Sequence, residues 1–470
     1  MRFPNACLFC LCLSFSGIAA AQGNPSGPSA AQQPAPAAPA APSAAAVPSG
    51  SVPEVNDSML APVEMPPQVL SNWQQALALV RSRSTSVASA QARVAQAQAQ
   101  SRQALSSVLP NISADGRVTR NLFSSTGPNA PGGLVLNATQ WNAGVSLQQS
   151  LINLRAWYDI GTSRLQERAA AVDEDNAERI ALGALADTIV SVVTAERVAE
   201  VNRVSLRSNL STLDLTKKRT LLGAASAVDV LRAEQEVATS RAGLVTGDEA
   251  LRRAREALGM ALGFPEAWGV APDIKVDQLA SDARSVCSAI QAPEQRSDVR
   301  SAQMNVQVNE RSISSPSYGQ APSLSLVSNL DYTSPAQFRA VTWSIGAVLS
   351  VPIFDGGQLA AERGVNRAAT ELARQNLTQV ERQARLEATQ AQRSVQVAQS
   401  TFEVSRQARD IAAESARLSR IAFVHGTGTS FDLVESARRQ REAEIDVTIK
   451  EFDIIRAQIT ALLALANCNI

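Results

Sequence analysis

Two stretches far apart in the chain, Gly223-Ala-Ala-Ser-Ala-Val-Asp229-Val-Leu231 and Gly426-Thr-Gly-Thr-Ser-Phe-Asp432-Leu-Val434, follow one plan. In each, a glycine is followed six residues later by an aspartate and then by two apolar residues. They lie about 203 residues apart, and a match at one fixed offset is how an internal repeat shows itself in a sequence. The chain therefore contains two copies of one unit.

The same offset relates other parts of the chain. Residues 146–153 align with residues 349–356 to within one position, so the segments that lead from there to the two glycines have matched lengths. Upstream, Ser89 to Val94 aligns with Ser301 to Val306 at about 212 residues. We assign the extra residues of the first copy to a longer hairpin loop.

Each copy is expected to contain the same elements in the same order. The first repeat covers 68–284 and the second covers 285–470. The expected order is a helix (about 70–107; about 285–315), a β-hairpin (about 110–150; about 322–351), a very long helix (about 154–222; about 358–424), a tip (about 223–228; about 425–430) and a return helix.

The hairpins are predicted from alternation of polar and apolar residues, as in Ile112 to Arg120 and Trp141 to Gln148. Such strands suit a wall between lipid and water, but four strands cannot close a barrel, which needs roughly eight. The long helices would extend about 100 Å and must pack on neighbours along their length. Their apolar residues are diluted by alanine, which suits close packing. The prediction is a mainly α fold with β hairpins.

The N-terminus has the pattern of an exported protein. Arg2, an apolar run and Ala19-Ala20-Ala21 predict a signal peptide at residues 1–21. No cysteine follows the cleavage site, so we expect no lipid anchor. Residues 22–67 are rich in Ala, Pro and Ser and are expected to form a disordered leader.

Composition excludes several classes of function. Lys plus Arg (43) balances Asp plus Glu (43), so nothing indicates a nucleic-acid partner. With one histidine, the chain offers no His-based metal cluster. The sequence also has no phosphate-binding glycine loop, and we expect neither an enzyme nor a cofactor. Beyond the signal no apolar run reaches the roughly 18 residues of a spanning helix, so a membrane span would be β.

On these residues the chain resembles the TolC or outer-membrane efflux protein family from about Gln68 to Asn467. The resemblance rests on Val351-Pro-Ile-Phe-Asp-Gly-Gly357, on the two tips, and on Arg296-Ser-Asp-Val-Arg-Ser-Ala302. It implies a homotrimer in the Gram-negative outer membrane, with four strands per protomer in one 12-strand β-barrel above a long periplasmic α-helical tunnel. It also implies a periplasmic adaptor protein and, through it, an inner-membrane transporter as partners.

The resemblance further implies a gate of acidic residues after the tips, for which Asp432, Glu435 and Asp229 are the candidates. Acids in a first helical turn are also stabilised by the helix dipole alone. The family's polar lock at the tip is largely missing here, because Phe423 and Gly428 stand in its place, so gating is expected to rest on packing. Gly223, Gly426 and His425 are the candidate adaptor contacts, and a solvated loop histidine is the alternative for His425.

Cys287 and Cys468 are the only cysteines beyond the signal. They form a disulfide if both are oxidised, and otherwise remain two buried thiols. The family's equatorial region would bring them close.

The function expected is the exit duct of a tripartite efflux or type I secretion system, through which substrate passes passively. The alternatives are a periplasmic coiled-coil adaptor, or a scaffold without channel activity. Neither explains matched hairpins in both copies.

Overall fold

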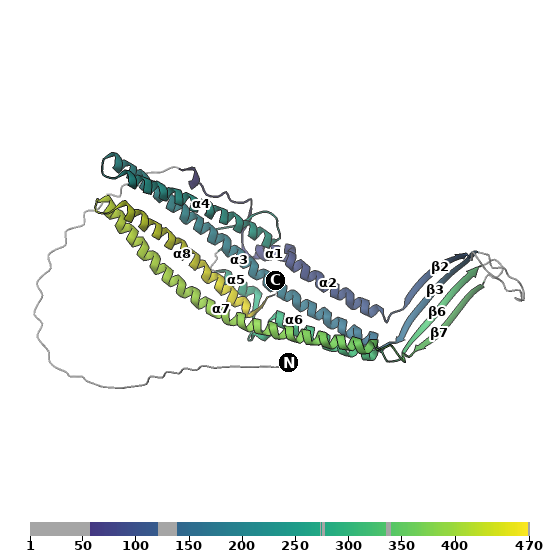
Figure 1. Ribbon diagram of the computed structural model, residues 1–470. Helices are drawn as coiled ribbons and strands as arrows, with labels where there is room; N and C mark the ends of the chain where they lie inside the picture. The colour runs from purple at the N-terminus through teal and green to yellow at the C-terminus, as the bar shows by residue number, and fades with distance from the viewer. Residues whose placement is uncertain (1–56, 121–138, 273, 275–277, 335–339, 469–470) are drawn as a thin grey trace, which may run out of the picture. The chain divides into compact units, whose positions relative to one another are not determined.

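Four strands form one antiparallel sheet in the order β2-β3-β6-β7. They are β2 (Asn111–Arg120), β3 (Thr139–Ile152), β6 (Ser323–Ser334) and β7 (Ala340–Ser350). The computed structural model describes residues 57–120, 139–272, 274, 278–334 and 340–468, all within one contact-defined unit, Pro53–Ile470. The two predicted hairpins thus join through β3 and β6 into a single sheet (Figure 1).

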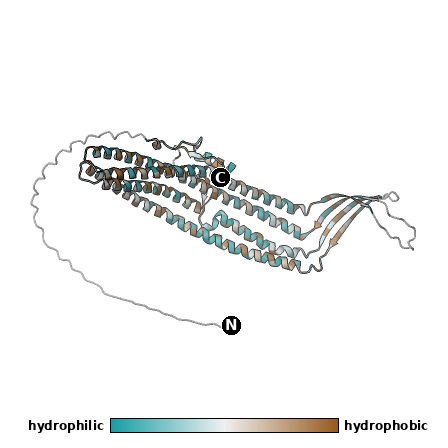
Figure 2. Ribbon diagram, turned by 45° about the horizontal axis from the view of Figure 1, so that its top comes forward, coloured by the Kyte–Doolittle hydropathy of each residue, from teal (hydrophilic) through white to brown (hydrophobic). Residues whose placement is uncertain are grey.

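The sheet has one apolar and one polar face. Register places Ile112 opposite Leu147, and Val145 opposite Leu330, which in turn lies opposite Trp343. Most of these side chains are exposed in the single chain, Trp343 by 77%. The other face carries Ser113, Asp115, Asn142, Ser146, Asn329 and Asp331. Alternation along the four strands, with exceptions such as Val327 and Ser328, therefore produces two chemically distinct surfaces. Along both the strands and the helices, hydrophobic and hydrophilic residues are interspersed (Figure 2).

Two long helical hairpins follow the strands. β3 leads through Asn153, whose side chain accepts a hydrogen bond from Ala156 N at 3.0 Å, into α3 (Leu154–Leu221), which turns back into α4 (Ala227–Leu262). β7 leads into α7 (Gln358–Val424), which turns back into α8 (Ser430–Ala464). The long helices begin and end within about a residue of their predicted bounds. No helix within the described ranges is long and apolar enough to cross a membrane.

The first helix of each copy differs from the prediction. Residues 70–107 form two helices, α1 (Trp73–Arg83) and α2 (Thr85–Ser106), because Ser84 is extended. Residues 82–86 are mainly Ser and Thr, which compete for backbone hydrogen bonds and favour such breaks. In the second copy α5 (Leu279–Val286), strand β5 (Cys287–Ala289) and a 3-10 turn (Pro293–Gln295) precede α6 (Ser297–Tyr318).

The main hydrophobic core surrounds the middle of α3. Leu182, Leu185 and Ile189 of α3 are at most 1% exposed. They belong to a cluster with residues of α1, the end of α4, α5 and the end of α8. Burial of large side chains is thus concentrated where short elements such as α1 and α5 pack against the long helices.

The expectation of a disordered leader through residue 67 is wrong for its last part. Residues from Asp57 onward lie along α4, where Arg241 bonds the Asp57 carboxylate at 2.7 Å and Arg255 bonds the Glu64 carbonyl at 2.9 Å. A 3-10 turn (Ser58–Leu60) packs Met59 and Leu60 on a small apolar cluster of α3 and α4. Strand β1 (Gln68–Leu70) then pairs with β4 (Trp268–Val270). Large apolar side chains reappear at these positions and supply the burial that the Ala/Pro-rich part lacks. Residues 1–56, including the predicted signal peptide, lie outside the described ranges.

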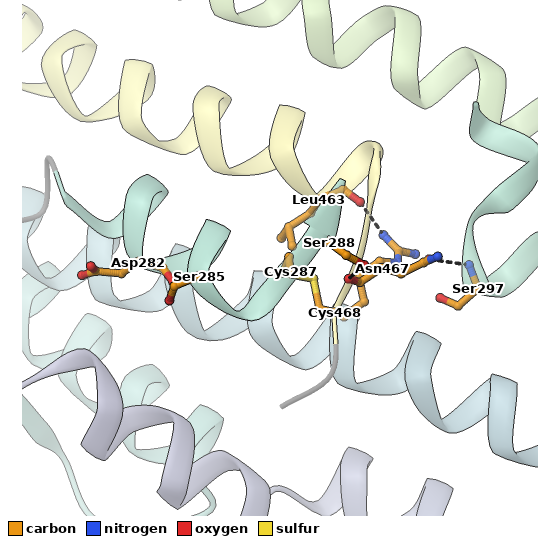
Figure 3. The surroundings of a disulfide bond; sticks show 9 residues. Asp282, Ser285, Cys287, Ser288, Ser297, Leu463, Asn467 and Cys468 are labelled. Atoms are coloured by element: carbon orange, nitrogen blue, oxygen red, sulfur yellow. Dashed lines mark hydrogen bonds between the residues drawn. A yellow bond between two sulfur atoms is a disulfide. The ribbon is translucent and has the colours of Figure 1, made fainter. Parts of the chain in front are cut away.

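A disulfide joins Cys287 and Cys468, which are 181 residues apart in the chain (Figure 3). They are directly opposite each other where β5 pairs with β8 (Ala466–Cys468). Next to it, Asn467 accepts a hydrogen bond from Ser297 N at 2.9 Å and donates one to the Gln295 carbonyl at 3.0 Å. The end of α8 is therefore attached to the segment that starts α6.

Removing this bond with Cys287→Ser plus Cys468→Ser should lower the free energy of unfolding by about 2–4 kcal/mol. The unfolded chain is then no longer closed into a long loop and gains conformational entropy. Urea titration of the oxidised wild type, the reduced wild type and the double variant measures the effect. Reduced wild type should match the variant. Equal stability of all three proteins would contradict the assignment.

Candidate functional site

The two helix turns have the same backbone design. Gly223 and Gly426 adopt left-handed conformations, with φ of 71° and 77°. Behind them Ala224 N bonds the Arg219 carbonyl at 2.8 Å, and Thr427 N bonds the Ala422 carbonyl at 2.9 Å. These bonds satisfy carbonyls that a helix end leaves free, and glycine adopts the conformation without steric cost.

The two aspartates of the repeat close capping boxes. Ser226 and Asp229 bond each other's backbone N–H at the start of α4, and Thr429 and Asp432 do the same at the start of α8. Each carboxylate accepts from the hydroxyl as well, at 2.8 Å in the first turn and 2.6 Å in the second. Both acids therefore stabilise helix starts, whatever further role they have.

Only Asp229 also reaches the other turn. Its carboxylate accepts a short hydrogen bond from the Ser430 hydroxyl on α8. Hydrogen bonds from Ser430 and from the Ser226 backbone lower the pKa of Asp229, which has Arg232 3.8 Å away. A lowered carboxyl pKa stabilises the folded state above the unfolded value of 3.8 and loses that effect only as pH falls below it. The bond therefore persists at neutral and mildly acidic pH.

A second contact between the turns comes from Arg219 of α3. Its guanidinium donates to the Phe423 carbonyl at 2.5 Å and to the Val424 carbonyl at 3.2 Å, and it lies 4.6 Å from the centre of the Phe423 ring. The two turns of one chain are therefore joined by a polar contact as well as by packing. Phe423 lacks a hydroxyl, but its backbone oxygen and ring face both receive the arginine.

Glu435 is engaged within its own helix. Arg438 and Arg439 each lie 2.8 Å from its carboxylate. The hydrogen bond from Arg438, with that from Arg439, lowers the pKa of Glu435 to about 2. The acid is ionised under all ordinary conditions, and two cations compensate its charge.

Further along the hairpins, Glu236 of α4 pairs with Arg441 of α8 at 2.9 Å. Glu236 is 8% exposed, and Arg441 also donates to Ser240, which accepts from Asn209 of α3. Burial raises the pKa of Glu236, which the nearby Arg441 opposes. This buried group joins three helices behind the turns.

Our sequence reasoning missed Arg219, Ser430, Glu236 and Arg441. One signal was available for Arg219, because the repeat offset places Ala422 opposite it and thus marks a charge that only one copy carries. His425 is exposed and caps the C-terminus of α7. Within the described ranges, no group of three or more His, Cys, Asp or Glu side chains could hold a metal ion.

The assembled features, namely long helical hairpins, paired turns and a two-faced sheet, define a fold also found in outer-membrane channels. The Campylobacter jejuni CmeC outer membrane channel matches with a TM-score of 0.70 at 15% identity, over 88% of this chain and 93% of that one. The family model for outer membrane efflux proteins matches residues 76–264 and 290–466. The chain belongs to the outer membrane efflux protein family.

Two curated proteins are similar in sequence. Nodulation protein T of Rhizobium leguminosarum bv. trifolii is 27% identical over 266 residues, which cover 54% of this chain and 56% of that protein. Fusaric acid resistance protein FusA of Burkholderia cepacia is 28% identical over 286 residues, which cover 57% and 52%. The chain thus spans about half the length of these relatives.

The two aspartates provide a matched test of the turns. Asp229→Ala removes a cap and the bond to Ser430, so amide hydrogen exchange should accelerate in both turns. Asp432→Ala removes a cap only, so exchange should accelerate in the second turn alone. A cap is worth about 1 kcal/mol, or about fivefold in exchange rate, measured by mass spectrometry. Unchanged exchange of the second turn in Asp229→Ala would contradict the contact between turns.

Proposed function

We propose that this chain is the exit channel of an export assembly in the Gram-negative outer membrane, and that it works as a homotrimer. The observation that carries the proposal is the two-faced sheet. One face is apolar and exposed, as a lipid-facing wall requires, and the other is polar, as a water-filled lumen requires. In this proposal the channel carries out no covalent chemistry, and substrate passes passively through its lumen.

The edges of the sheet support the trimer. Strands β2 and β7 are the two ends of the sheet, and each has a neighbour on one side only among the described strands. An exposed apolar strand edge is a template for pairing with another chain. Three copies would supply twelve strands, enough to close one barrel and leave no edge.

Helix α7 gives independent support. Its buried positions are mostly alanines, while larger apolar residues point outward. Val397, Val404, Ile411 and Leu418 recur every seven residues and are 52–66% exposed. These apolar residues therefore face outward from the single chain, and their seven-residue spacing matches the seam of a coiled coil between copies. In our proposal, a neighbouring copy of the chain packs against this stripe of α7.

At the turns we propose the periplasmic gate. Asp229, with Arg219, holds the two hairpins together in the closed state, while Asp432 and Glu435 line the constriction. Gly223, Gly426 and His425 present the turns to a periplasmic adaptor protein, which links the channel to an inner-membrane transporter of a tripartite efflux or type I secretion system. The name of one relative, a fusaric acid resistance protein, fits export.

A periplasmic adaptor or a scaffold without channel activity is the competing function. Such a protein would need the helical hairpins but not an amphipathic four-stranded sheet. Insertion into a bilayer separates the two proposals.

Single-channel recording in planar bilayers tests the channel and the gate together. Arg219→Ala should raise the open probability about tenfold, because charged hydrogen bonds of about 1.5–3 kcal/mol are lost. The matched control is Arg417→Ala on α7, whose guanidinium bonds Glu414 within its own helix. Folded wild-type protein without any conductance would refute the channel, and equal openings in both variants would refute the latch.

The same recordings test the acidic lining. Asp432→Asn plus Glu435→Gln removes the carboxylate partner of Arg439 and leaves Arg438 paired with Glu442 alone. Reversal potentials in a salt gradient should then shift toward anion selectivity. An unchanged reversal potential would remove Asp432 and Glu435 from the gate.

A further inference from the structure

A groove of about 640 Å³ lies between α3, α7 and α8, near the level of the disulfide. Its walls are mainly apolar and include Ile180, Gly183, Ala391, Ile459, Leu463 and Ala464. Ile180 is 56% exposed there, and Gly183 has no side chain to keep Leu463 away, since a Cβ would lie 3.0 Å from the Leu463 methyl group. The volume is that of a site for a small organic molecule.

The groove lies at the margin of the hydrophobic core, since Val190, Ile459 and Leu463 belong both to its wall and to the core cluster. Ile180, Gly183 and Asp187 recur at three- and four-residue spacing and share one helix face. Leu182, Leu185 and Ile189 occupy the opposite face and are buried in the core. The inference places the short elements around that core on the outside of the proposed tunnel, so that the groove opens into the lumen.

Charges at the rim of the groove are unequally paired. The two carboxylates that line it each have an arginine, since Arg456 bonds Asp187 and Arg296 bonds Glu387 at 2.7 Å. Arg179 lines the groove with neutral partners only, the Leu463 carbonyl at 3.3 Å and Asn176 at 2.9 Å. Its Nε is buried and has no hydrogen-bond partner within the described residues.

Among the described residues, Arg179 is therefore a cation without a carboxylate in contact. Burial and the neighbouring Arg296 hold the pKa of Arg179 below its ordinary value, which Asp298 and Glu387 partly oppose. Asp298 and Glu387 make their direct contacts with Arg296, at 2.6 and 2.7 Å, and act on Arg179 only from a distance. A bound anion would give the Arg179 guanidinium a charged hydrogen-bond partner.

We propose that this groove is a transit site that binds small organic carboxylates, with the apolar part of the ligand against α3, α7 and α8 and its carboxylate on Arg179. The inference rests on the proposed function for its lumenal position only. It assigns the channel wall a preference among exported molecules, in favour of apolar acids over apolar alcohols or amines of the same shape.

Calorimetric titration of the full chain in zwitterionic nanodiscs tests the site with three probes of one shape, 1-naphthoate, 1-naphthalenemethanol and 1-naphthylmethylammonium. Naphthoate should bind once per chain and about tenfold more tightly than the alcohol, because a charged hydrogen bond is gained. Arg179→Gln should reduce naphthoate binding to the level of the alcohol and leave the alcohol unchanged. Arg164→Gln, at an exposed position on the same helix, is the matched control and should change neither.

A second variant covers the case in which Arg179→Gln fails to fold. Ile180→Glu, at an exposed groove position, should weaken naphthoate by repulsion and strengthen the ammonium probe. Absence of naphthoate binding, or equal affinity for the three probes, would overturn the proposal. Conductance of the same samples separates this from failure of the channel, because a conducting protein that binds no naphthoate refutes only the site.

Discussion

An unpaired strand edge is the constraint on which the rest of this structure depends. Backbone N–H and C=O groups must be satisfied, and in a membrane no water does so. Here four strands form an amphipathic sheet whose two edges belong to β2 and β7, and whose apolar face is exposed in the single chain. Neither feature is stable alone, and the association of copies that we propose satisfies both. The apolar stripe of α7 is likewise exposed in the single chain and would be buried by packing against a neighbouring copy.

Duplication explains how one chain obtains both equal and unequal contacts. Both turns use a left-handed glycine and a hydroxyl–aspartate capping box, so each hairpin can reverse independently of its surroundings. The contacts between hairpins use side chains that the other copy lacks, since Arg219 matches Ala422 and Ser430 matches Ala227 in the repeat. Local closure is thus separated from the contacts that a gate would break. Loss of a capping box alone should therefore affect one turn, whereas loss of a contact between hairpins should affect both turns.

Much of this fold could be predicted because its signals are local. The glycines, the matched aspartates and the alternation in Ile112 to Arg120 each determine structure within a few residues, so the turns, strands and long helices were located closely. The break at Ser84 has a local signal in the Ser/Thr-rich residues 82–86, which the prediction of one helix did not use. The ordered segment after Asp57 depends on packing against α3 and α4, which the composition of residues 22–67 does not show. The candidate site was found only in outline. Asp229 was identified by repeat alignment, whereas the reach of Arg219 to Phe423 joins residues 204 apart and depends on how two hairpins pack.

Oxidative cross-linking of the sheet edges tests most directly whether copies share their strands. Cysteines at Ser113, Asp115 or Arg117 of β2 would be combined, pair by pair, with cysteines at Thr342, Ser344 or Gly346 of β7, so that the unknown register is scanned. The account predicts that at least one pair links neighbouring copies in outer membranes, and that the ladder of products on non-reducing gels ends at three chains. Monomers for every pair, or a ladder that continues beyond three, would contradict a closed trimeric barrel.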